Sequence, residues 1–278
     1  MKTRKIAVCL SGQSRVWNYT KENIMRFYNI DHIGLNPAEV DFFIHTWDIN
    51  SYRDHTIGTS YYSEFWDEAA DTNGIVEYFK PKGWEIESYN QYKINRNNVW
   101  NFHLTAWEPM YHSFKKSINL KRNYELENNF EYDLVIKSRF DCMFNPNTPF
   151  EAFIPDIMKA YTTTSIHRIT NEFNCSNFDE AVFFGESRTM DLLSLTGDLH
   201  LINRKKMIEI GDTFNPMPEI YFGPGSLIFK HMVNMHICPD YHPKPFHYFV
   251  ARRHVVDTGY CPIADWDKVA ASCKDWYR

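Results

Sequence analysis

A continuous apolar run, Ile-Ala-Val-Cys-Leu at residues 6–10, breaks at Ser11-Gly12 and restricts the fold more than any other feature. A strand that is exposed on one face alternates polar and apolar residues, so an unbroken run predicts a strand buried on both faces. Such strands belong to parallel sheets. A helical segment from Trp17 to Tyr28 and a second apolar run over residues 40–48 follow. This order of strand, helix and strand predicts a βαβ unit.

Further elements are predicted along the rest of the chain from short apolar or alternating segments and from helical spacing. The segment 53–73 is polar and has no clear period, so it is expected to be irregular or to form short helices. The sequence therefore predicts an α/β fold with a mostly parallel central sheet flanked by helices and an irregular carboxyl-terminal part. The further strands are expected at 84–89, 132–137, 159–163 and 179–185, and the further helices at 99–118, 188–199 and 219–233.

Composition narrows the class of protein. The 278 residues are 44% hydrophobic and 23% charged, as in soluble globular chains, and we expect a single domain. A net charge of -5 gives no global field for gripping a polyanion, so no nucleic acid partner is expected. The 6 cysteines form no CxxC pair, which favours reduced thiols and a cytoplasmic location. No apolar window is long enough for a transmembrane segment, so any work at a membrane is expected from outside the bilayer.

Polar groups follow three of the predicted strands, at Ser11-Gly12-Gln13-Ser14-Arg15, at His45-Thr46-Trp47-Asp48 and at Ser138-Arg139-Phe140-Asp141. In a doubly wound sheet, ligands bind beyond the carboxyl ends of the strands, where the strand order reverses. Gly12 allows a close approach of the backbone to a ligand, and Arg15 is a candidate partner for phosphate. The spacing matches neither common phosphate-binding motif, and a purely structural turn is the alternative.

Two acidic residues at strand ends are candidates for binding. Asp141 follows a buried strand, and its carboxylate suits Mn²⁺ or Mg²⁺, which could bridge it to a diphosphate. An ion pair between Arg139 and Asp141 is the alternative. Asp48 is a candidate for holding a ribose hydroxyl, and a helix cap is its alternative. Trp47 is a candidate for stacking on a sugar or a base.

The succession of these motifs, completed by Asp179-Glu180 before Phe183-Phe184-Gly185, resembles the GT-A-like glycosyltransferases of bacteria, phages and large viruses, and in particular lipopolysaccharide-synthesis transferases of the WavE type. The resemblance spans residues 5–235. It implies a Rossmann-like nucleotide-binding half (1–150), an acceptor-binding half with a tail (151–278), and a metal at an Asp-x-Asp motif. Here that motif reads Arg139-Phe140-Asp141, so arginine replaces the first acid and could itself neutralise part of a diphosphate.

Glycosyl transfer needs stabilisation of the departing nucleoside diphosphate and, for inversion, a base for the acceptor hydroxyl. The first role falls to Arg139 and Arg15, or to Asp141 with a metal. Asp179 and Glu180 match the acidic position of the family, with Asp179 the first candidate for the base and Glu219 the second. A helix cap or a contact with a sugar hydroxyl is the alternative for these acids. Late histidines, His247 and His254, are candidates for joining a metal, and an ordinary core or surface histidine is the alternative for each.

The leading hypothesis is a hexosyltransferase that moves a sugar from a nucleoside-diphosphate sugar to a glycan or a lipid-linked acceptor. The second hypothesis is a non-catalytic nucleotide- or carbohydrate-binding protein on the same fold, motivated by the missing first acid. A sulfotransferase is a third hypothesis, which the absence of a lysine-rich phosphate loop after the first strand disfavours.

Overall fold

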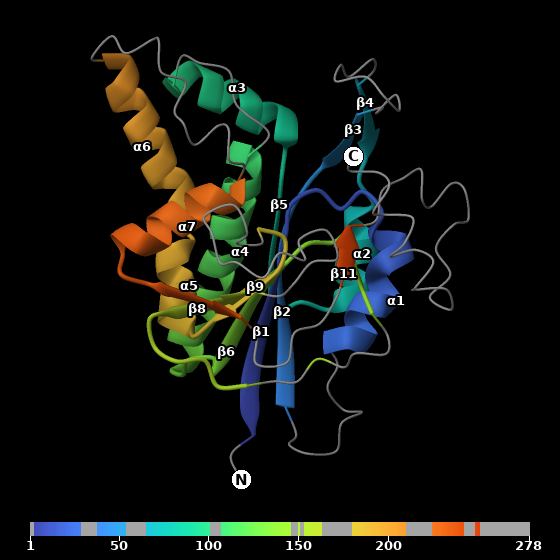
Figure 1. Cartoon of the computed structure of the whole chain (residues 1–278). Coiled ribbons are helices and arrows are strands. Elements are labelled where there is room, and N and C mark those ends of the chain that lie inside the picture. Colours follow the sequence, from blue (N-terminus) through green and yellow to red (C-terminus); the bar gives the residue numbers. More distant parts are fainter. Residues whose placement is uncertain are drawn as a thin grey trace.

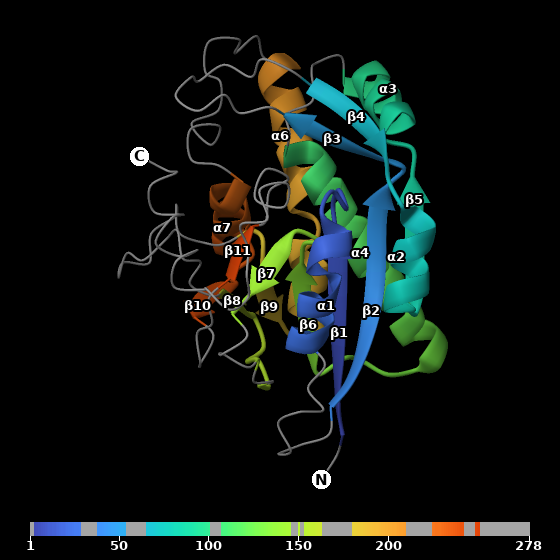
Figure 2. The same cartoon turned by 90° about the vertical axis from the view of Figure 1, so that its right-hand side faces the viewer.

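The computed structural model describes residues 3–28, 38–53, 65–100, 107–145, 150, 153–162, 180–209, 224–241 and 248–250. Seven strands form a central sheet in the order β10-β8-β9-β6-β1-β2-β5 (Figures 1 and 2). Among these seven, β9 runs antiparallel to both of its neighbours, and all the other pairs are parallel. The mostly parallel sheet expected from the sequence is confirmed. Its strands are β1 (Arg4–Ser11), β2 (Ala38–Trp47), β5 (Gly83–Glu87), β6 (Leu134–Ser138), β8 (Lys159–Thr162), β9 (Phe183–Gly185) and β10 (Cys238–Tyr241).

The central strand β1 is buried on both faces, as its unbroken apolar run predicts. Ile6, Val8 and Leu10 point into one core, while Ala7 and Cys9 point into a second core on the other face. This division follows from the two-residue period of a strand. The sheet is therefore the middle layer of three, and β1 contributes side chains to both interfaces.

Helices cover the two faces of the sheet (Figures 1 and 2). α1 (Trp17–Tyr28) and α2 (Thr72–Phe79) pack on the face of Ile6 and Val8. α1 buries Trp17, Thr20, Ile24, Phe27 and Tyr28, a spacing of three and four residues that makes one helical stripe. The opposite face is covered by helices whose buried residues join the second core: α4 (Trp107–Asn128), α5 (Ser187–Leu193) and α7 (Pro224–Asn234).

Several boundaries differ from the sequence-based prediction. The segment expected to be irregular contains β3 (Ile49–Arg53) and β4 (Phe65–Ala69), which pair as an antiparallel hairpin, and then α2. Its strands are polar, so hydrophobic periodicity does not reveal them. The helix expected at 99–118 overlaps two described helices, the end of α3 (Tyr89–Trp100) and the first part of α4, while residues 101–106 lie outside the described part.

The helix expected at 188–199 also divides, into α5 and α6 (Thr196–Glu209). The division falls between Leu193 and Thr196. The hydroxyls of Ser194 and Thr196 each donate to a backbone carbonyl three residues earlier, that of Asp191 and that of Leu193. Such local bonds compete with regular helix geometry. Residues 219–223 of the last predicted helix lie outside the described part, and α7 begins at Pro224. A final strand, β11 (Tyr248–Val250), pairs with β7 (Cys142–Phe144).

Two further expectations concern thiols and membranes. Cys9, Cys142 and Cys238 are free cysteines, of which the first two are buried and the third is exposed. None of the helices within the described ranges combines the length and the apolar character that crossing a bilayer requires.

Candidate functional site

The strand order reverses at β1. The chain moves from β1 through α1 to β2 on one side, and β6 later pairs with β1 on the other side. Both pairings are parallel, so the carboxyl ends of the three strands meet at one edge. The β1–β6 register ends at Leu10 opposite Ser138, so the loops that follow, one with Gly12 and one with Arg139, begin side by side. Ligands of open α/β sheets bind in a crevice at such a reversal.

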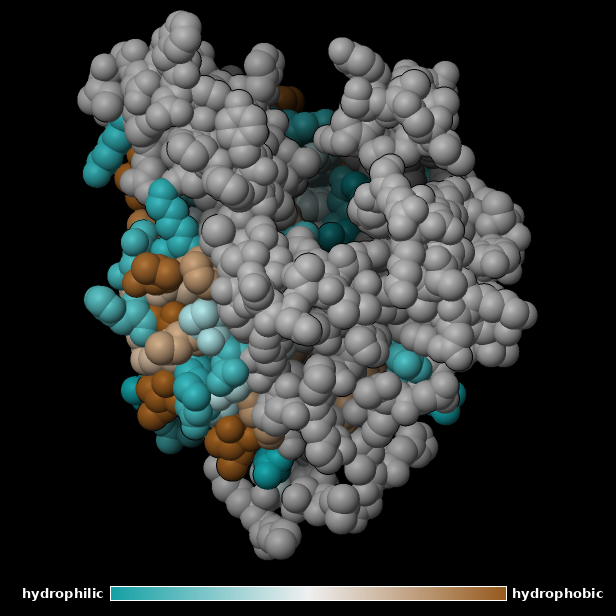
Figure 3. All heavy atoms as spheres, in the orientation of Figure 1, coloured by the Kyte–Doolittle hydropathy of each residue, from teal (hydrophilic) through white to brown (hydrophobic). Residues whose placement is uncertain are grey.

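Gly12 is the first residue after β1, and its backbone conformation favours glycine. Its φ is 108°, and a Cβ built on it would meet nothing within 4 Å. The position therefore has both a strained conformation for other residues and open space above it. Figure 3, in the orientation of Figure 1, shows a hydrophilic hollow over the carboxyl ends of the strands. α1 starts five residues later, at Trp17, so the positive end of its dipole also faces this edge of the sheet.

Both backbone groups of Gly12 are held from below. Its N–H donates to Ser113 Oγ on α4 at 2.6 Å, and its carbonyl accepts from Thr46 Oγ1 on β2 at 3.0 Å. Ser113 Oγ in turn lies 2.7 Å from His45 Nδ1 and donates to the carbonyl of His45 at 3.1 Å. The loop that faces the crevice is thus fixed by β2 and by α4 before any ligand arrives.

The other residues predicted to bind a ligand from this loop differ in their exposure. Ser11 ends β1 and is 3% exposed, so its hydroxyl does not face a ligand. Gln13 and Arg15 are half-buried, and Arg15 Nε donates to Gln13 Oε1 at 2.8 Å. The guanidinium of Arg15 therefore lies against the loop.

Arg139 and Asp141 form a bidentate ion pair. Nε of Arg139 donates to Oδ1 at 2.8 Å, and Nη2 donates to Oδ2 at 2.6 Å. The Asp141 side chain is 2% exposed and that of Arg139 is 22% exposed. Burial lowers the pKa of Arg139, but the charge and hydrogen bonds of Asp141 outweigh it and raise the pKa well above its usual range. The alternative considered from the sequence, an internal ion pair, is what the structure contains.

The fit of a divalent cation at Asp141 follows from this geometry. Mn²⁺ and Mg²⁺ need carboxylate oxygens that are open to the ion and its water ligands. Both oxygens of Asp141 are bonded to a guanidinium and are buried. As arranged here, the residues do not fit a metal, and Mn²⁺ or Mg²⁺ at Asp141 stays a prediction from the resemblance.

Asp48 caps a helix. Its Oδ1 accepts the backbone N–H of Tyr89 at 2.9 Å, at the start of α3. Its backbone also bridges β5 and the end of β4, since its N–H donates to Glu87 and its carbonyl accepts from Ala70. This is the cap that the sequence left as the alternative to a ribose contact. Trp47 is 1% exposed, so it offers no open face for stacking on a sugar or a base.

Glu180 lies at the same edge of the sheet as the loop of Arg139. It precedes β9, which runs antiparallel to β6, and its charge contributes to the raised pKa of Arg139. Its backbone carbonyl accepts from the ammonium of Lys137, which also donates to the carbonyl of Ala181 at 3.2 Å. Asp179, Glu219, His247 and His254 lie outside the described residues, so their predicted roles stay predictions.

Sequence reasoning missed two buried cations and a histidine cluster. Lys137 is 1% exposed and Lys121 is fully buried. A lysine inside an apolar strand run was the available signal for Lys137. The histidine cluster joins His45, Glu87 and His112, whose ligating atoms lie within 4.8 Å of one another. No local spacing reveals it, because the three residues come from β2, β5 and α4.

No protein-family model and no curated protein sequence matches the chain. The strand order, the open loop at Gly12 and the charged residues of the neighbouring loop are therefore the features that bear on function.

Proposed function

We propose that the chain is a sugar-nucleotide-dependent glycosyltransferase of the hexosyltransferase type on a GT-A-like fold. It moves a sugar from a nucleoside-diphosphate sugar to a glycan or a lipid-linked acceptor. The observation that carries the proposal is the reversal point between β1 and β6, where the loops that contain Gly12 and Arg139 begin at neighbouring strand ends. This is where nucleotides bind in open α/β sheets, and the resemblance to glycosyltransferases suggests a sugar nucleotide in particular.

The charges at this point suit a diphosphate. Arg139 has five N–H donors, of which the pair with Asp141 uses two. The remaining donors can face a phosphate while Asp141 keeps the guanidinium plane in place. Arg15 adds a second cation from the first loop, and the amino end of α1 adds a partial positive charge. Together they stabilise the negative charge that a nucleoside diphosphate gains as it leaves the sugar.

The base that takes the proton of the acceptor hydroxyl is assigned to Asp179, with Glu180 beside it and Glu219 as the second candidate. Glu180, the described neighbour of Asp179, supports this assignment because it precedes β9 at the edge of the sheet where the loop of Arg139 begins. No step is routed through a metal at Asp141.

The test is isothermal titration of the protein with uridine and guanosine diphosphates and their hexose conjugates, with and without Mn²⁺. We expect binding without Mn²⁺ and slow hydrolysis of one donor. Arg139→Lys keeps the positive charge next to Asp141 but lacks the planar fork, so it should weaken binding by about tenfold or more. Arg188→Gln is the matched control, because Arg188 is exposed and pairs with Glu131 on the surface. Failure of every nucleotide to bind would refute the proposal.

One observation favours the second candidate function, a non-catalytic nucleotide- or carbohydrate-binding protein. The acidic residue that would hold a metal is closed by Arg139. A binding protein of this kind would show nucleotide affinity with no donor hydrolysis in the presence of either Mn²⁺ or Mg²⁺, whereas the enzyme shows turnover.

A further inference from the structure

Three potential ligand atoms from three elements meet below the first loop. Glu87 Oε2 on β5 lies 2.7 Å from His112 Nε2 on α4 and 3.7 Å from His45 Nε2 on β2. Two imidazoles and one carboxylate form a common set of protein ligands for Zn²⁺. A tetrahedral zinc ion with bonds of about 2.0–2.1 Å keeps its ligand atoms about 3.3 Å apart. The shorter distance must lengthen and the longer one must shorten, each by less than about 1 Å.

His45 presents a lone pair to this cluster. Its side chain is fully buried, and its Nε2 has no hydrogen-bond partner among the described residues. Ser113 has one hydroxyl proton, which it donates to the carbonyl of His45 while accepting from the N–H of Gly12. When Ser113 donates to this carbonyl, His45 Nδ1 is the donor in its 2.7 Å contact with Ser113 Oγ, and this tautomer leaves Nε2 unprotonated. An orienting hydrogen bond of this kind on the far nitrogen is typical of metal-binding histidines.

The unprotonated Nε2 faces a carboxylate, which is unfavourable unless a cation lies between them. A metal-binding imidazole must be neutral, and the full burial of the His45 ring favours the neutral form. The neighbouring ammonium of Lys116 pairs with Glu87 and favours the charged form of its carboxylate.

The net charge of the residues around the cluster is compatible with a divalent ion. Lys116 Nζ lies 2.6 Å from Glu87 Oε1 and 2.7 Å from Glu85 Oε1, so it occupies the other oxygen of Glu87 and not the one that faces the histidines. With both histidines neutral, two carboxylates and one ammonium give a charge of -1. Zn²⁺ would lie between Glu87 Oε2 and His112 Nε2 while the proton of the neutral His112 moves to Nδ1, so the charge would become +1.

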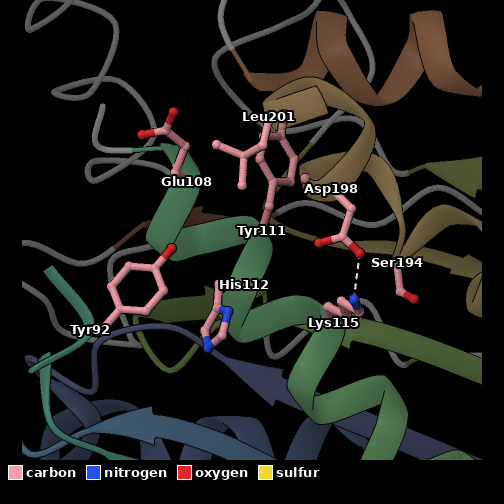
Figure 4. Close-up of a pocket in the computed structure, with 9 residues that line it drawn as sticks. Tyr92, Glu108, Tyr111, His112, Lys115, Ser194, Asp198 and Leu201 are labelled. Atoms are coloured by element: carbon pink, nitrogen blue, oxygen red, sulfur yellow. Dashed lines mark hydrogen bonds and ion pairs between the residues drawn. The ribbon is translucent and has the colours of Figure 1, made fainter. Parts of the chain in front are cut away.

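A small pocket borders the cluster at His112, which lines it together with Tyr92, Glu108 and Lys115 (Figure 4). The volume of this pocket is about 10 Å³, which holds about one water molecule and is too small for a sugar nucleotide. On the other sides, Trp47 lies 5.1 Å from the ring of His45 and 5.7 Å from that of His112, between ring centres. The protein would supply three ligands, and a water would supply the fourth.

We propose that His45, Glu87 and His112 form a binding site for a divalent transition metal ion, with Zn²⁺ the best match, that is separate from the nucleotide crevice. The ion joins β2, β5 and α4. Through His45 and Ser113 it also holds the N–H of Gly12, so it stabilises the first loop from below. The proposal stands on the geometry of these residues and does not depend on the glycosyltransferase assignment.

The test uses the full chain after removal of metals with EDTA. Zn²⁺ is titrated in competition with a chromophoric chelator, and Co²⁺ is added separately to record its visible absorption. We expect one equivalent of either ion and a Co²⁺ spectrum typical of four ligands. His112→Gln and Glu87→Gln each remove one ligand and should weaken Zn²⁺ binding by at least about 100-fold, since loss of an outer-shell partner alone costs about 10–100-fold.

Glu85→Gln is the matched control, because it removes a carboxylate that also pairs with Lys116 but is not a ligand. It should keep the full equivalent of Zn²⁺. Anomalous diffraction at the zinc edge from crystals of the unaltered protein locates the ion without any variant. No stoichiometric binding, an ion located elsewhere, or equal affinity in Glu87→Gln and the unaltered protein would overturn the proposal.

Discussion

Replacing Asp141 with asparagine removes a buried negative charge and leaves the guanidinium of Arg139 without its ionic partner. Both oxygens of Asp141 bond to Arg139, at 2.8 and 2.6 Å, and the carboxylate is 2% exposed. Breaking a buried ion pair by removing one partner typically costs about 3–5 kcal/mol. The Arg139 side chain is 22% exposed, so water reaches it and the lower end, about 3 kcal/mol, is expected.

For a chain of 278 residues, about 3 kcal/mol corresponds to a lowering of Tm by about 5 °C. The measurement is thermal and urea unfolding of Asp141→Asn beside Asp198→Asn. Asp198 pairs with Lys115, and both side chains are about one third exposed, so this control should lose no more than about 1 kcal/mol. Pyrophosphate should raise the Tm of Asp141→Asn more than that of the unaltered protein, since the anion replaces the missing carboxylate.

Two results would refute the reasoning. If Asp141→Asn unfolds within about 1 kcal/mol of the unaltered protein, the ion pair does not hold this loop. If Mn²⁺ without nucleotide stabilises the unaltered protein and the effect disappears in Asp141→Asn, then Asp141 is a metal ligand and the pair opens readily.

Three further predictions concern the surroundings of the site. Lys121→Met should lower the free energy of unfolding in urea by about 3–5 kcal/mol, because the fully buried ammonium lies 2.8–2.9 Å from the carboxylates of Glu125 and Asp191. The control Lys115→Met, on the same helix, removes a more exposed ion pair and should lower it by no more than about 1 kcal/mol. Asp48→Ala should cost about 1 kcal/mol through loss of the α3 cap and leave nucleotide affinity unchanged in titrations; a loss of affinity would restore the ribose role. Burial raises the pKa of Cys142 to about 12, so an alkylating reagent at pH 8 should label Cys238 and spare Cys142 in native protein, as peptide mapping would show.

The parts of the fold that sequence analysis predicts are those with strong local signals. β1 follows from five consecutive apolar residues, and α1 follows from a helical stripe between Trp17 and Tyr28. The β3–β4 hairpin cannot be predicted in this way, because its strands pair Ile49 with Ala69 across a polar segment that lacks a hydrophobic period. The boundary between α5 and α6 depends on hydroxyl-to-carbonyl bonds within one turn, which hydrophobic spacing does not register.

The candidate site shows the same limit. Gly12 and Arg139 could be brought together from sequence because the carboxyl ends of parallel strands share one edge. From the sequence, the pairing of Arg139 with Asp141 is only an alternative to a metal at Asp141, because a sequence does not show whether a carboxylate faces a neighbouring side chain or a ligand. The cluster of His45, Glu87 and His112 needs the register of β2 with β5 and the position of α4, so no motif could predict it.

The central claim is that a nucleoside diphosphate binds where the strand order reverses. The most direct measurement is a crystal structure of the protein soaked with uridine or guanosine diphosphate, with and without Mn²⁺. We predict density for the diphosphate between Gly12 and Arg139, with the guanidinium still paired to Asp141. Density at another place on the protein, or a crevice that stays empty at millimolar nucleotide, would contradict the account.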